Sequence, residues 1–302
     1  MNEVGIHMKT LIIGSTTVDI IIKLPHLPST CEDINTPAHI YSLGGCAYNV
    51  SHMFHLFELP YTLCTPQGTG LYGDYVRNEL AKKGITLPIE TNEPHGACVC
   101  LVDSNGERSF LCHHGTEYFF YKDHLDHIDT TNVNQVYICG LEIEEPTGDN
   151  IIDYLETLDA TIFFAPGPRI LSIPQAKLNR LFKLSPVIHL NEQEITSYTK
   201  TSSIEEACLQ LSKLTNNDII VTLGEKGAYY YHEHCGTYIP GNPSAVVDTI
   251  GAGDSHLGSY MAALQMGYTP KNAIALANTI ASQVVQIEGA SLTKEQFKRV
   301  FN

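Results

Sequence analysis

Short apolar runs alternate along the chain with longer segments whose apolar residues recur at helical spacing. A short apolar run is typical of a buried strand, and an apolar stripe at every third or fourth residue is typical of a helix lying on a sheet. Their alternation predicts an α/β domain with a mostly parallel sheet. We expect strands at residues 10–13, 61–65, 135–139, 161–165, 187–190 and 218–222, and helices at 47–57, 74–84, 204–214 and 255–266.

Two β-rich regions interrupt this alternation. One of them contains the turn Asp103-Ser104-Asn105-Gly106, and an Asn-Gly step is a strong hairpin signal. We expect the two regions to pair into one small sheet, a lid that covers the mouth of the large domain and excludes water there. The expected division is a large α/β domain of residues 1–15, 43–94 and 117–302, and a β lid of residues 16–42 and 95–116.

The composition limits the kinds of partner. The 302 residues include 18 basic and 33 acidic side chains, a net charge of -15, without the basic stripe of nucleic-acid-binding proteins, so we expect no nucleic-acid partner. No stretch approaches the roughly 18 to 20 apolar residues of a membrane-spanning helix, so we expect no membrane segment. A chain so poor in cations must neutralise a phosphate with Mg²⁺, backbone N–H groups and helix N-termini.

The cysteines and the first residues favour a cytoplasmic protein. Nine cysteines, an odd number without a close CxxC pair, suggest reduced thiols rather than a disulfide framework. Cys98 and Cys100 alternate along an expected strand, which places both on one face as packing residues. The start, MNEVGIHMKTLIIG, lacks the basic region, apolar stretch and cleavage site of a secretory signal.

The strongest chemical signal is the segment Asp248-Thr249-Ile250-Gly251-Ala252-Gly253-Asp254, which leads into an expected helix. Its small residues allow backbone N–H groups to converge on an anion, and the helix N-terminus adds partial positive charge. Asp254 brings a carboxylate to the same place, where it could take a proton from an attacking hydroxyl during phosphoryl transfer. A bare GAGD could equally be a tight strand-to-helix connection with Asp254 as the cap.

The longer string DTIGAGD, at this distance from the C-terminus, resembles the signature of the ribokinase-like (PfkB) family of carbohydrate and nucleoside kinases. The first signature of that family, GG-x-x-x-N before a helix, is matched by Gly44, Gly45 and Asn49. The resemblance implies a doubly wound, ribokinase-like α/β fold with a β lid, and a kinase that uses ATP and Mg²⁺. It also implies that Asp254 is the catalytic base, beside an anion hole of Gly251, Ala252 and Gly253.

The resemblance also implies an acceptor site. Asp19, after the first strand, resembles the aspartate that accepts hydrogen bonds from sugar hydroxyls, and Gly44, Gly45 and Asn49 complete the site. Taken alone, Asp19 could cap a turn and Asn49 could simply start a helix. The segment Gly70-Leu71-Tyr72-Gly73-Asp74 resembles the family's G-x-x-GD turn.

Nucleotide and metal residues follow in the same way. Asn191 and Glu194 match an N-x-x-E motif that orients Mg²⁺ waters and phosphates, although alone they could only cap a helix. The backbone at Asp248 and Ile250, with the turn 288–291, resembles a loop pair that holds a monovalent cation in some members, so K⁺ activation is a hypothesis. The implied nucleotide contacts are Asn191, Glu194, Thr222, Gly224, Gly227 and Asn278.

Two arginines and several histidines stand beside these motifs. Arg108, after the hairpin turn, is assigned to binding the acceptor, and Arg169, after a Pro-Gly-Pro bend, to binding the nucleotide. The alternative for each is a solvent-exposed side chain without a functional contact. His256 replaces an aromatic residue of many relatives, and we expect it to be packed rather than to tune the site. The pairs His113-His114 and His232-x-His234 lack a foreseeable third ligand and do not predict a zinc site.

The leading functional hypothesis is a kinase for a sugar of the ribose, fructose or sugar-acid type. The alternative acceptor is a nucleoside, either a purine nucleoside or pseudouridine. A non-catalytic ligand-binding or regulatory relative would not need Asp254, and a dinucleotide-dependent oxidoreductase would need a GxGxxG turn where the chain has Gly14-Ser15-Thr16-Thr17. An exposed sheet face on the lid would allow a homodimer.

Overall fold

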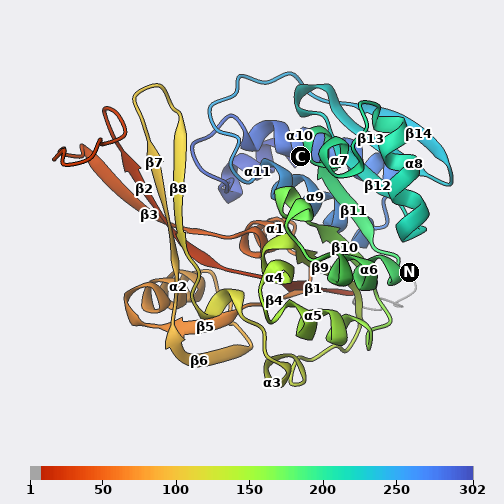
Figure 1. Cartoon of the computed structure of the whole chain (residues 1–302), viewed down its shortest axis with the longest axis horizontal. Coiled ribbons are helices and arrows are strands. Elements are labelled where there is room, and N and C mark those ends of the chain that lie inside the picture. The colour runs from red at the N-terminus through yellow and green to blue at the C-terminus, as the bar shows by residue number, and fades with distance from the viewer. Residues whose placement is uncertain (1–7, 302) are drawn as a thin grey trace.

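The computed structural model describes residues 8–301, and an eight-stranded sheet runs through it between two layers of helices (Figure 1). Six strands are parallel, and the hairpin of β13 and β14 adds two antiparallel strands at one edge. The six predicted strands are confirmed, whereas the edge hairpin was not predicted. In sheet order the strands are β14 (Cys235–Pro240), β13 (Gly227–His232), β12 (Ile219–Thr222), β11 (Val187–Asn191), β10 (Thr161–Ala165), β9 (Val133–Cys139), β1 (Lys9–Ile13) and β4 (Tyr61–Cys64).

Helices cover both faces of this sheet because its strands are apolar on both sides, as parallel strands usually are. In β10, for example, Phe163 packs with the helices of one layer and Phe164 with those of the other. The doubly wound α/β fold is therefore confirmed. One layer contains α1 (Cys46–Leu56), α9 (Ala252–Gln265), α10 (Pro270–Val284) and α11 (Lys294–Phe301); the other contains α3 (Lys122–Leu125), α4 (Gly140–Glu144), α5 (Gly148–Leu155), α6 (Gln175–Lys183), α7 (Glu192–Thr199) and α8 (Ile204–Thr215). A further helix, α2 (Gly70–Lys82), packs beside the second sheet described below.

A second, four-stranded mixed sheet projects from the body beside the carboxyl ends of the parallel strands (Figure 1). We call it the lid sheet. It joins the two β-rich regions of the sequence, as expected, and its strand β3 runs to Gly44, slightly past the expected boundary at residue 42. Its strands, in order, are β3 (Ala38–Gly44), β2 (Thr17–Lys23), β7 (Ala97–Val102) and β8 (Arg108–His113).

Strand register divides the lid sheet into two faces. Asp19 pairs with Ser42 on one side and with Cys98 on the other, and Cys98 pairs in turn with Cys112. Residues opposite one another in a sheet point the same way, so these four share a face. Lys23 lies on the same face and forms an ion pair with Glu288 of the body, so this face is directed toward the body.

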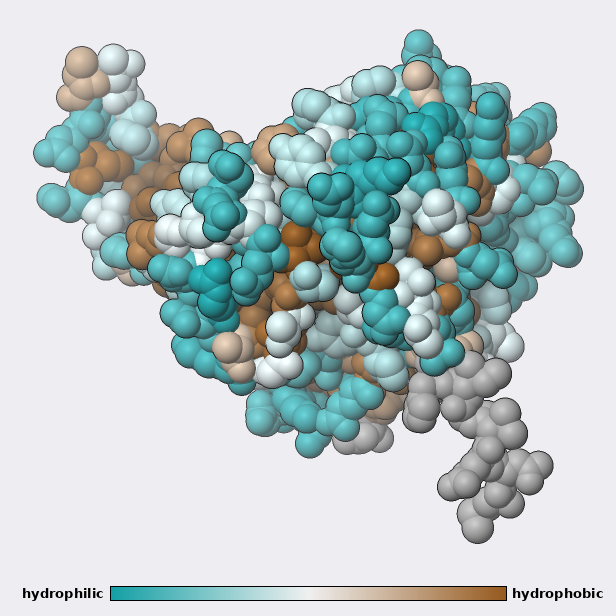
Figure 2. Space-filling view, turned by 90° about the horizontal axis from the view of Figure 1, so that it is seen from below, coloured by the Kyte–Doolittle hydropathy of each residue, from teal (hydrophilic) through white to brown (hydrophobic). Residues whose placement is uncertain are grey.

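Both faces of the lid sheet leave apolar side chains in solvent. Ile40 and Phe110 are exposed on the face of Asp19, and Tyr41 and Leu111 are exposed on the opposite face. Figure 2 shows this arm projecting from the body with hydrophobic patches among polar residues.

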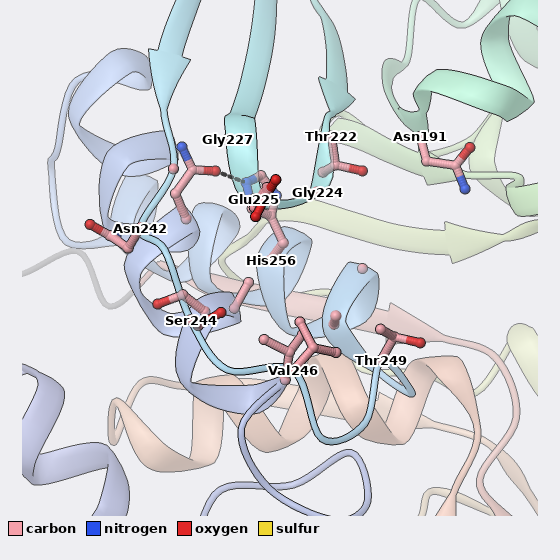
Figure 3. Close-up of a pocket in the computed structure, with 17 residues that line it drawn as sticks. Asn191, Thr222, Gly224, Glu225, Gly227, Asn242, Ser244, Val246, Thr249 and His256 are labelled. Carbon is pink, nitrogen blue, oxygen red and sulfur yellow. Dashed lines mark hydrogen bonds between the residues drawn. The ribbon is translucent and has the colours of Figure 1, made fainter. Parts of the chain in front are cut away.

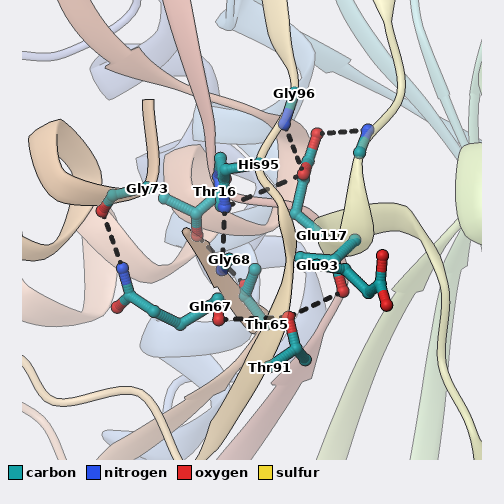
Figure 4. A network of polar contacts seen from close by, with 12 residues as sticks. Thr16, Thr65, Gln67, Gly68, Gly73, Thr91, Glu93, His95, Gly96 and Glu117 are labelled. Atoms are coloured by element: carbon teal, nitrogen blue, oxygen red, sulfur yellow. Dashed lines mark hydrogen bonds and ion pairs between the residues drawn. The ribbon is translucent and has the colours of Figure 1, made fainter. Parts of the chain in front are cut away.

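A buried polar network joins the lid sheet to the body (Figure 4). His95 Nε2 lies 2.8 Å from the carbonyl oxygen of Thr16, and its Nδ1 accepts a hydrogen bond from Gly68 N at 3.1 Å. The fully buried Glu117 accepts hydrogen bonds from the backbone N–H groups of Gly96 and Gly115. A short pair of strands, β5 (Pro66–Thr69) and β6 (Ile89–Pro94), and the 3₁₀ turn η1 (Thr116–Tyr118) surround this network.

Candidate active site

Asp254 lies in the first turn of α9, at the carboxyl end of the main sheet. One carboxylate oxygen, Oδ2, accepts a hydrogen bond of 2.9 Å from Nδ2 of Asn49 in α1. Burial raises the pKa of Asp254 to about 6, against the opposing effect of that hydrogen bond. The carboxyl group is therefore mostly ionised at neutral pH, yet it is a much better proton acceptor than a solvent-exposed aspartate.

The turn before Asp254 leaves backbone donors free. Gly251, the N-cap of α9, has φ +70°, and a Cβ atom there would overlap Ala290, so the position requires glycine. Within residues 8–301, no acceptor lies against the N–H groups of Gly251, Gly253 or Asp254. A helix N-terminus with free N–H groups attracts an anion, so this turn can hold a phosphate beside the carboxylate.

Four of the predicted acceptor residues, Asp19, Gly44, Gly45 and Asn49, come together near Asp254. Asp19 lies over Gly44, where any Cβ atom would overlap its carboxylate, and Gly45 has φ +93°, where a Cβ atom would overlap the backbone of Ser15. Burial and then the negative charge of Asp254 raise the pKa of Asp19 to about 6. The sequence thus identified two carboxylates close enough to repel one another.

Several buried polar atoms around these carboxylates have no hydrogen-bond partner among the residues that the structure describes. They are Ser15 Oγ, Asn49 Oδ1, Tyr137 Oη and Ser255 Oγ. An unpaired buried polar atom is costly, so a set of them beside two carboxylates is typical of a site that binds a polar ligand.

Glu142 is a site residue that the sequence analysis missed. It follows β9, and its Oε1 accepts a hydrogen bond of 2.7 Å from Ser15 N while Oε2 accepts one of 2.7 Å from the Cys139 thiol. Burial raises the pKa of Glu142, and its charge in turn raises that of Asp254. Its position just after a buried strand could have indicated a site residue, because functional residues often lie at the carboxyl ends of parallel strands.

Two cavities meet at Asn191, Thr222 and Gly253. The larger, of about 480 Å³, reaches Asp254, Cys46 and Tyr137. The other, of about 290 Å³, extends along α9 and α10. Figure 3 shows the second cavity, with strand ends on one side and a loop on the other; its lining includes Thr222, Gly224, Gly227, Asn242, Ser244 and Val246.

Asn191 and Glu194 form a reciprocal capping box at the start of α7. Asn191 Oδ1 accepts a hydrogen bond from Glu194 N at 2.8 Å, and Glu194 Oε2 accepts one from Asn191 N at 2.9 Å. The motif thus has the helix-capping role that the sequence allowed, while both residues also line the larger cavity. Burial raises the pKa of Glu194, against the opposing effect of the hydrogen bond from Asn191 N.

Asn278 lines the smaller cavity, as its assignment required, but its amide is engaged by the protein. Its Nδ2 donates to the carbonyl oxygens of Ile239 and Pro240, and its Oδ1 lies 3.0 Å from His256 Nε2. His256 Nδ1 lies 3.0 Å from His189, and burial lowers the pKa of His256 to about 4. His256 is therefore a neutral, packed residue, as expected.

The two arginines occupy different places. Arg169 lines the larger cavity and is bound through Nη1 to Glu144 at 2.9 Å. Arg108 lines neither cavity; its guanidinium forms a close ion pair with Asp248, which joins the lid sheet to the loop before α9. Against the effect of burial, Arg108 and two backbone N–H groups lower the pKa of Asp248.

The loops expected to hold a monovalent cation do lie together. Asp248 Oδ1 accepts a hydrogen bond from Ile250 N, and its Oδ2 accepts one from Gly289 N, both at 2.8 Å. Arg108 supplies positive charge at the same carboxylate. A potassium ion would therefore have to share Asp248 with this guanidinium.

One histidine of each predicted pair has its own partner. His114 stacks on Tyr118 at 3.8 Å between ring centroids and lies 2.6 Å from Glu145, and His232 lies 2.6 Å from Asp218. Residues 8–301 contain no group of three or more His, Cys, Asp or Glu side chains arranged to hold a metal ion. In the same part of the chain, every helix is too short or too polar to cross a membrane.

Comparison with known proteins decides the family. The model of the pfkB family of carbohydrate kinases matches residues 8–296, nearly the whole chain. The chain belongs to this family. PfkB carbohydrate kinases are phosphotransferases with an alcohol group as acceptor, so the chain is an enzyme of that class.

Individual relatives agree with this assignment. The chain is 31% identical to the uncharacterized sugar kinase YegV of Escherichia coli, over 95% of this chain and 91% of that one. A ribokinase of Thermotoga maritima has the same fold, with a TM-score of 0.85 at 21% identity, over 97% and 99% of the two chains. Arabidopsis thaliana ribokinase, whose structure contains ribose and ATP, has a TM-score of 0.77 at 20% identity, over 97% and 98%.

Proposed function

We propose that this PfkB kinase transfers the γ-phosphoryl group of ATP to a hydroxyl of a sugar of the ribose, fructose or sugar-acid type. One observation carries the proposal: the Asp254 carboxylate is held by Asn49 beside a turn with free N–H groups, where two cavities meet. A base beside an anion site, with room for a nucleotide and its phosphates, is what an in-line transfer to an alcohol requires.

The smaller cavity suits the nucleotide. Its walls are mostly small or apolar residues, and it ends at Gly253, next to the free N–H groups of the turn. A nucleotide that lies along α10 would therefore present its terminal phosphate to the N-terminus of α9. Thr222, Gly224 and Gly227 line the opposite wall, in agreement with their assignment.

The larger cavity suits the phosphates and Mg²⁺. Arg169, Asn191 and Glu194 border it, and only one oxygen of Glu194 is occupied by the capping box. We assign Glu194 to Mg²⁺ through water, because Mg²⁺ retains several waters and takes few protein carboxylates. The ion would neutralise charge on the phosphates, which this acidic chain cannot do with its own side chains.

Asp254 is the general base in this proposal. Asn49 Nδ2 holds Oδ2, which leaves Oδ1 to take the proton of the attacking hydroxyl. Asp19 and the free Oδ1 of Asn49 accept hydrogen bonds from neighbouring hydroxyls and so orient the acceptor.

A nucleoside is the second candidate acceptor. Phe110 is exposed on the face of the lid sheet that carries Asp19, and an aromatic side chain there could stack on a nucleobase while Asp19 binds the ribose. The family name and the name of the E. coli relative favour the sugar.

A screen of ATP consumption against sugars, sugar acids and nucleosides tests the proposal. We expect the preferred acceptor to be a sugar, and a nucleoside with a higher kcat/KM would overturn the choice. Asp254→Asn should reduce turnover about 1,000-fold while ATP binding persists, because a general base contributes roughly 10²- to 10⁴-fold. Near-normal turnover in Asp254→Asn would refute the base. A wild-type protein that binds ligands without turnover would indicate the regulatory relative.

Assembly and compartment remain predictions. Tyr41 and Leu111, exposed on the outer face of the lid sheet, support a homodimer through this face, which sedimentation can test. The nine cysteines are all free, which suits a reducing compartment such as the cytoplasm.

A further inference from the structure

Two thiols of the lid sheet lie against each other. Cys98 in β7 and Cys112 in β8 are direct partners in the antiparallel register, and their Sγ atoms are 3.1 Å apart. Cys98 was predicted to be a packing residue because its spacing from Cys100 places both on one face of a strand. The contact makes the two cysteines a dithiol instead.

The backbone at this pair has the spacing that a disulfide needs. The carbonyl oxygen of Val102, in the same strand, accepts a hydrogen bond of 2.8 Å from Leu24 N, so it points toward β2 and away from β8. Backbone direction alternates along a strand, and Cys98, four residues earlier, also points away from β8. A non-hydrogen-bonded pair of this kind has Cα atoms about 4.5 Å apart, within the range that a disulfide spans.

The pair is also accessible and close to the acceptor residues. Cys112 is exposed to solvent, whereas Cys98 is half-buried and is the register partner of Asp19. Burial and the contact with Cys112 raise the pKa of the Cys98 thiol. An oxidant therefore reaches Cys112 first, and Cys98 is placed to resolve the product.

We propose that Cys98 and Cys112 form a redox modification site, at which a peroxide converts the dithiol into a cross-strand disulfide beside Asp19. In the first step the Cys112 sulfur takes one oxygen from hydrogen peroxide, which gives a sulfenic acid and one water. In the second, the Cys98 sulfur attacks the Cys112 sulfur, the S–S bond forms, and hydroxide leaves with the thiol proton as a second water. Two thiols are thereby oxidised and one peroxide is reduced.

The disulfide would alter acceptor binding. It draws the two sulfur atoms from 3.1 Å to a bond of about 2.05 Å and fixes both side chains in one geometry, on the face of the lid sheet that carries Asp19. A small displacement of an orienting carboxylate weakens substrate positioning. This consequence rests on the proposed role of Asp19, whereas disulfide formation does not.

The first test is chemical and needs no activity. The folded protein is treated with a small excess of hydrogen peroxide, its remaining thiols are alkylated, and its peptides are mapped by mass spectrometry. We expect a Cys98–Cys112 peptide pair that dithiothreitol releases, and its loss in Cys98→Ser and in Cys112→Ser. Cys235→Ser, which removes another exposed cysteine, should leave the pair intact. Failure to form this pair in folded wild-type protein, or a preference of Cys112 for Cys100, would overturn the proposal.

The second test measures the consequence in the oxidised protein. We expect the acceptor KM to rise about threefold or more, with the ATP KM unchanged and full recovery after reduction. Cys112→Ser should show no such change on peroxide treatment. If the disulfide forms and the acceptor KM stays constant, the link to Asp19 is overturned. If reduced wild-type protein turns over no acceptor at all, the proposed kinase function fails instead.

Discussion

The turn before α9 and the lid sheet place their carboxylates by different means. Asp254 is positioned by a helix N-terminus, by a turn whose shape depends on Gly251, and by the hydrogen bond from Asn49 in α1. Asp19 is positioned by strand register and by the missing side chain at Gly44. The pKa of each is raised to about 6, so the electrostatic outcome is similar. Under the proposed function, the body would set the chemistry and the lid sheet would set which acceptor is held.

The strongest test of the body side is Gly251→Ala. The added Cβ would overlap Ala290 and strain a left-handed residue, which would redirect the N–H groups of the turn. We expect kcat to fall about 100-fold, since loss of one aligned donor to a transition state costs roughly 10²- to 10³-fold. The acceptor KM should change little, and steady-state kinetics measures both.

Gly267→Ala is the matched control for this variant. Gly267 follows α9 and also has positive φ, +87°, but a Cβ there meets nothing within 4 Å. It should cost stability and leave kcat near normal. Equal losses of kcat in the two variants would show that backbone strain, and not the direction of the N–H groups of the turn, is responsible.

The corresponding test of the lid side is Gly44→Ala. Its Cβ would displace the Asp19 carboxylate, so we expect the acceptor KM to rise about tenfold while the ATP KM is unchanged. Ser109→Ala, on the opposite face of the lid sheet, serves as control. A fall in kcat with a normal acceptor KM would contradict the division between the two regions.

The raised pKa values predict the pH dependence. The base must be ionised, and its folded-state pKa is about 6, so kcat/KM should be close to its plateau at pH 7 and decline as pH falls through 6. At pH 5 we expect a loss of about tenfold or more, because Asp19 is protonated over the same range. Rates measured from pH 5 to 8, with folding followed by circular dichroism, check this. A flat profile between pH 5 and 7 would exclude Asp254 as the titrating base.

The smallest expected effect concerns the ion pair between the two regions. Arg108→Met would leave the buried Asp248 without its cation, and we expect a loss of a few-fold in kcat/KM. We also expect the variant to respond more strongly than wild type to potassium, compared with a large organic cation at equal ionic strength. Equal rates in the two salts for both proteins would remove the potassium hypothesis.

Local patterns predicted the fold well. The strand Thr161–Ala165 was predicted at its observed bounds, because a five-residue apolar run between polar turns allows little else. The capping box of Asn191 and Glu194 was likewise readable from spacing alone. Gly44, Gly45, Asn49 and Asp254 were found through the family resemblance, and the structure brings them together.

The contacts that escaped prediction join distant parts of the chain. Arg108 and Asp248 are 140 residues apart, and the guanidinium could have pointed to any anion of the site. Cys98 and Cys112 meet because of the register between β7 and β8, which could not be predicted from the sequence. A shift of one residue would turn every side chain of a strand to the other face of the sheet. Glu142 was missed because a carboxylate after a strand is common.

The network around His95 and Glu117 limits how the lid sheet can move relative to the body. The connections between the lid sheet and the body are held at several points. Thr16 is bound by His95, and Gly96 and Gly115 are bound by Glu117. Gly45 packs against the backbone next to Thr16. A strand cannot shift alone without breaking a buried hydrogen bond. Any movement of the lid sheet that kept these hydrogen bonds would therefore have to carry its four strands together, because the bonds hold the connections on both sides of the sheet.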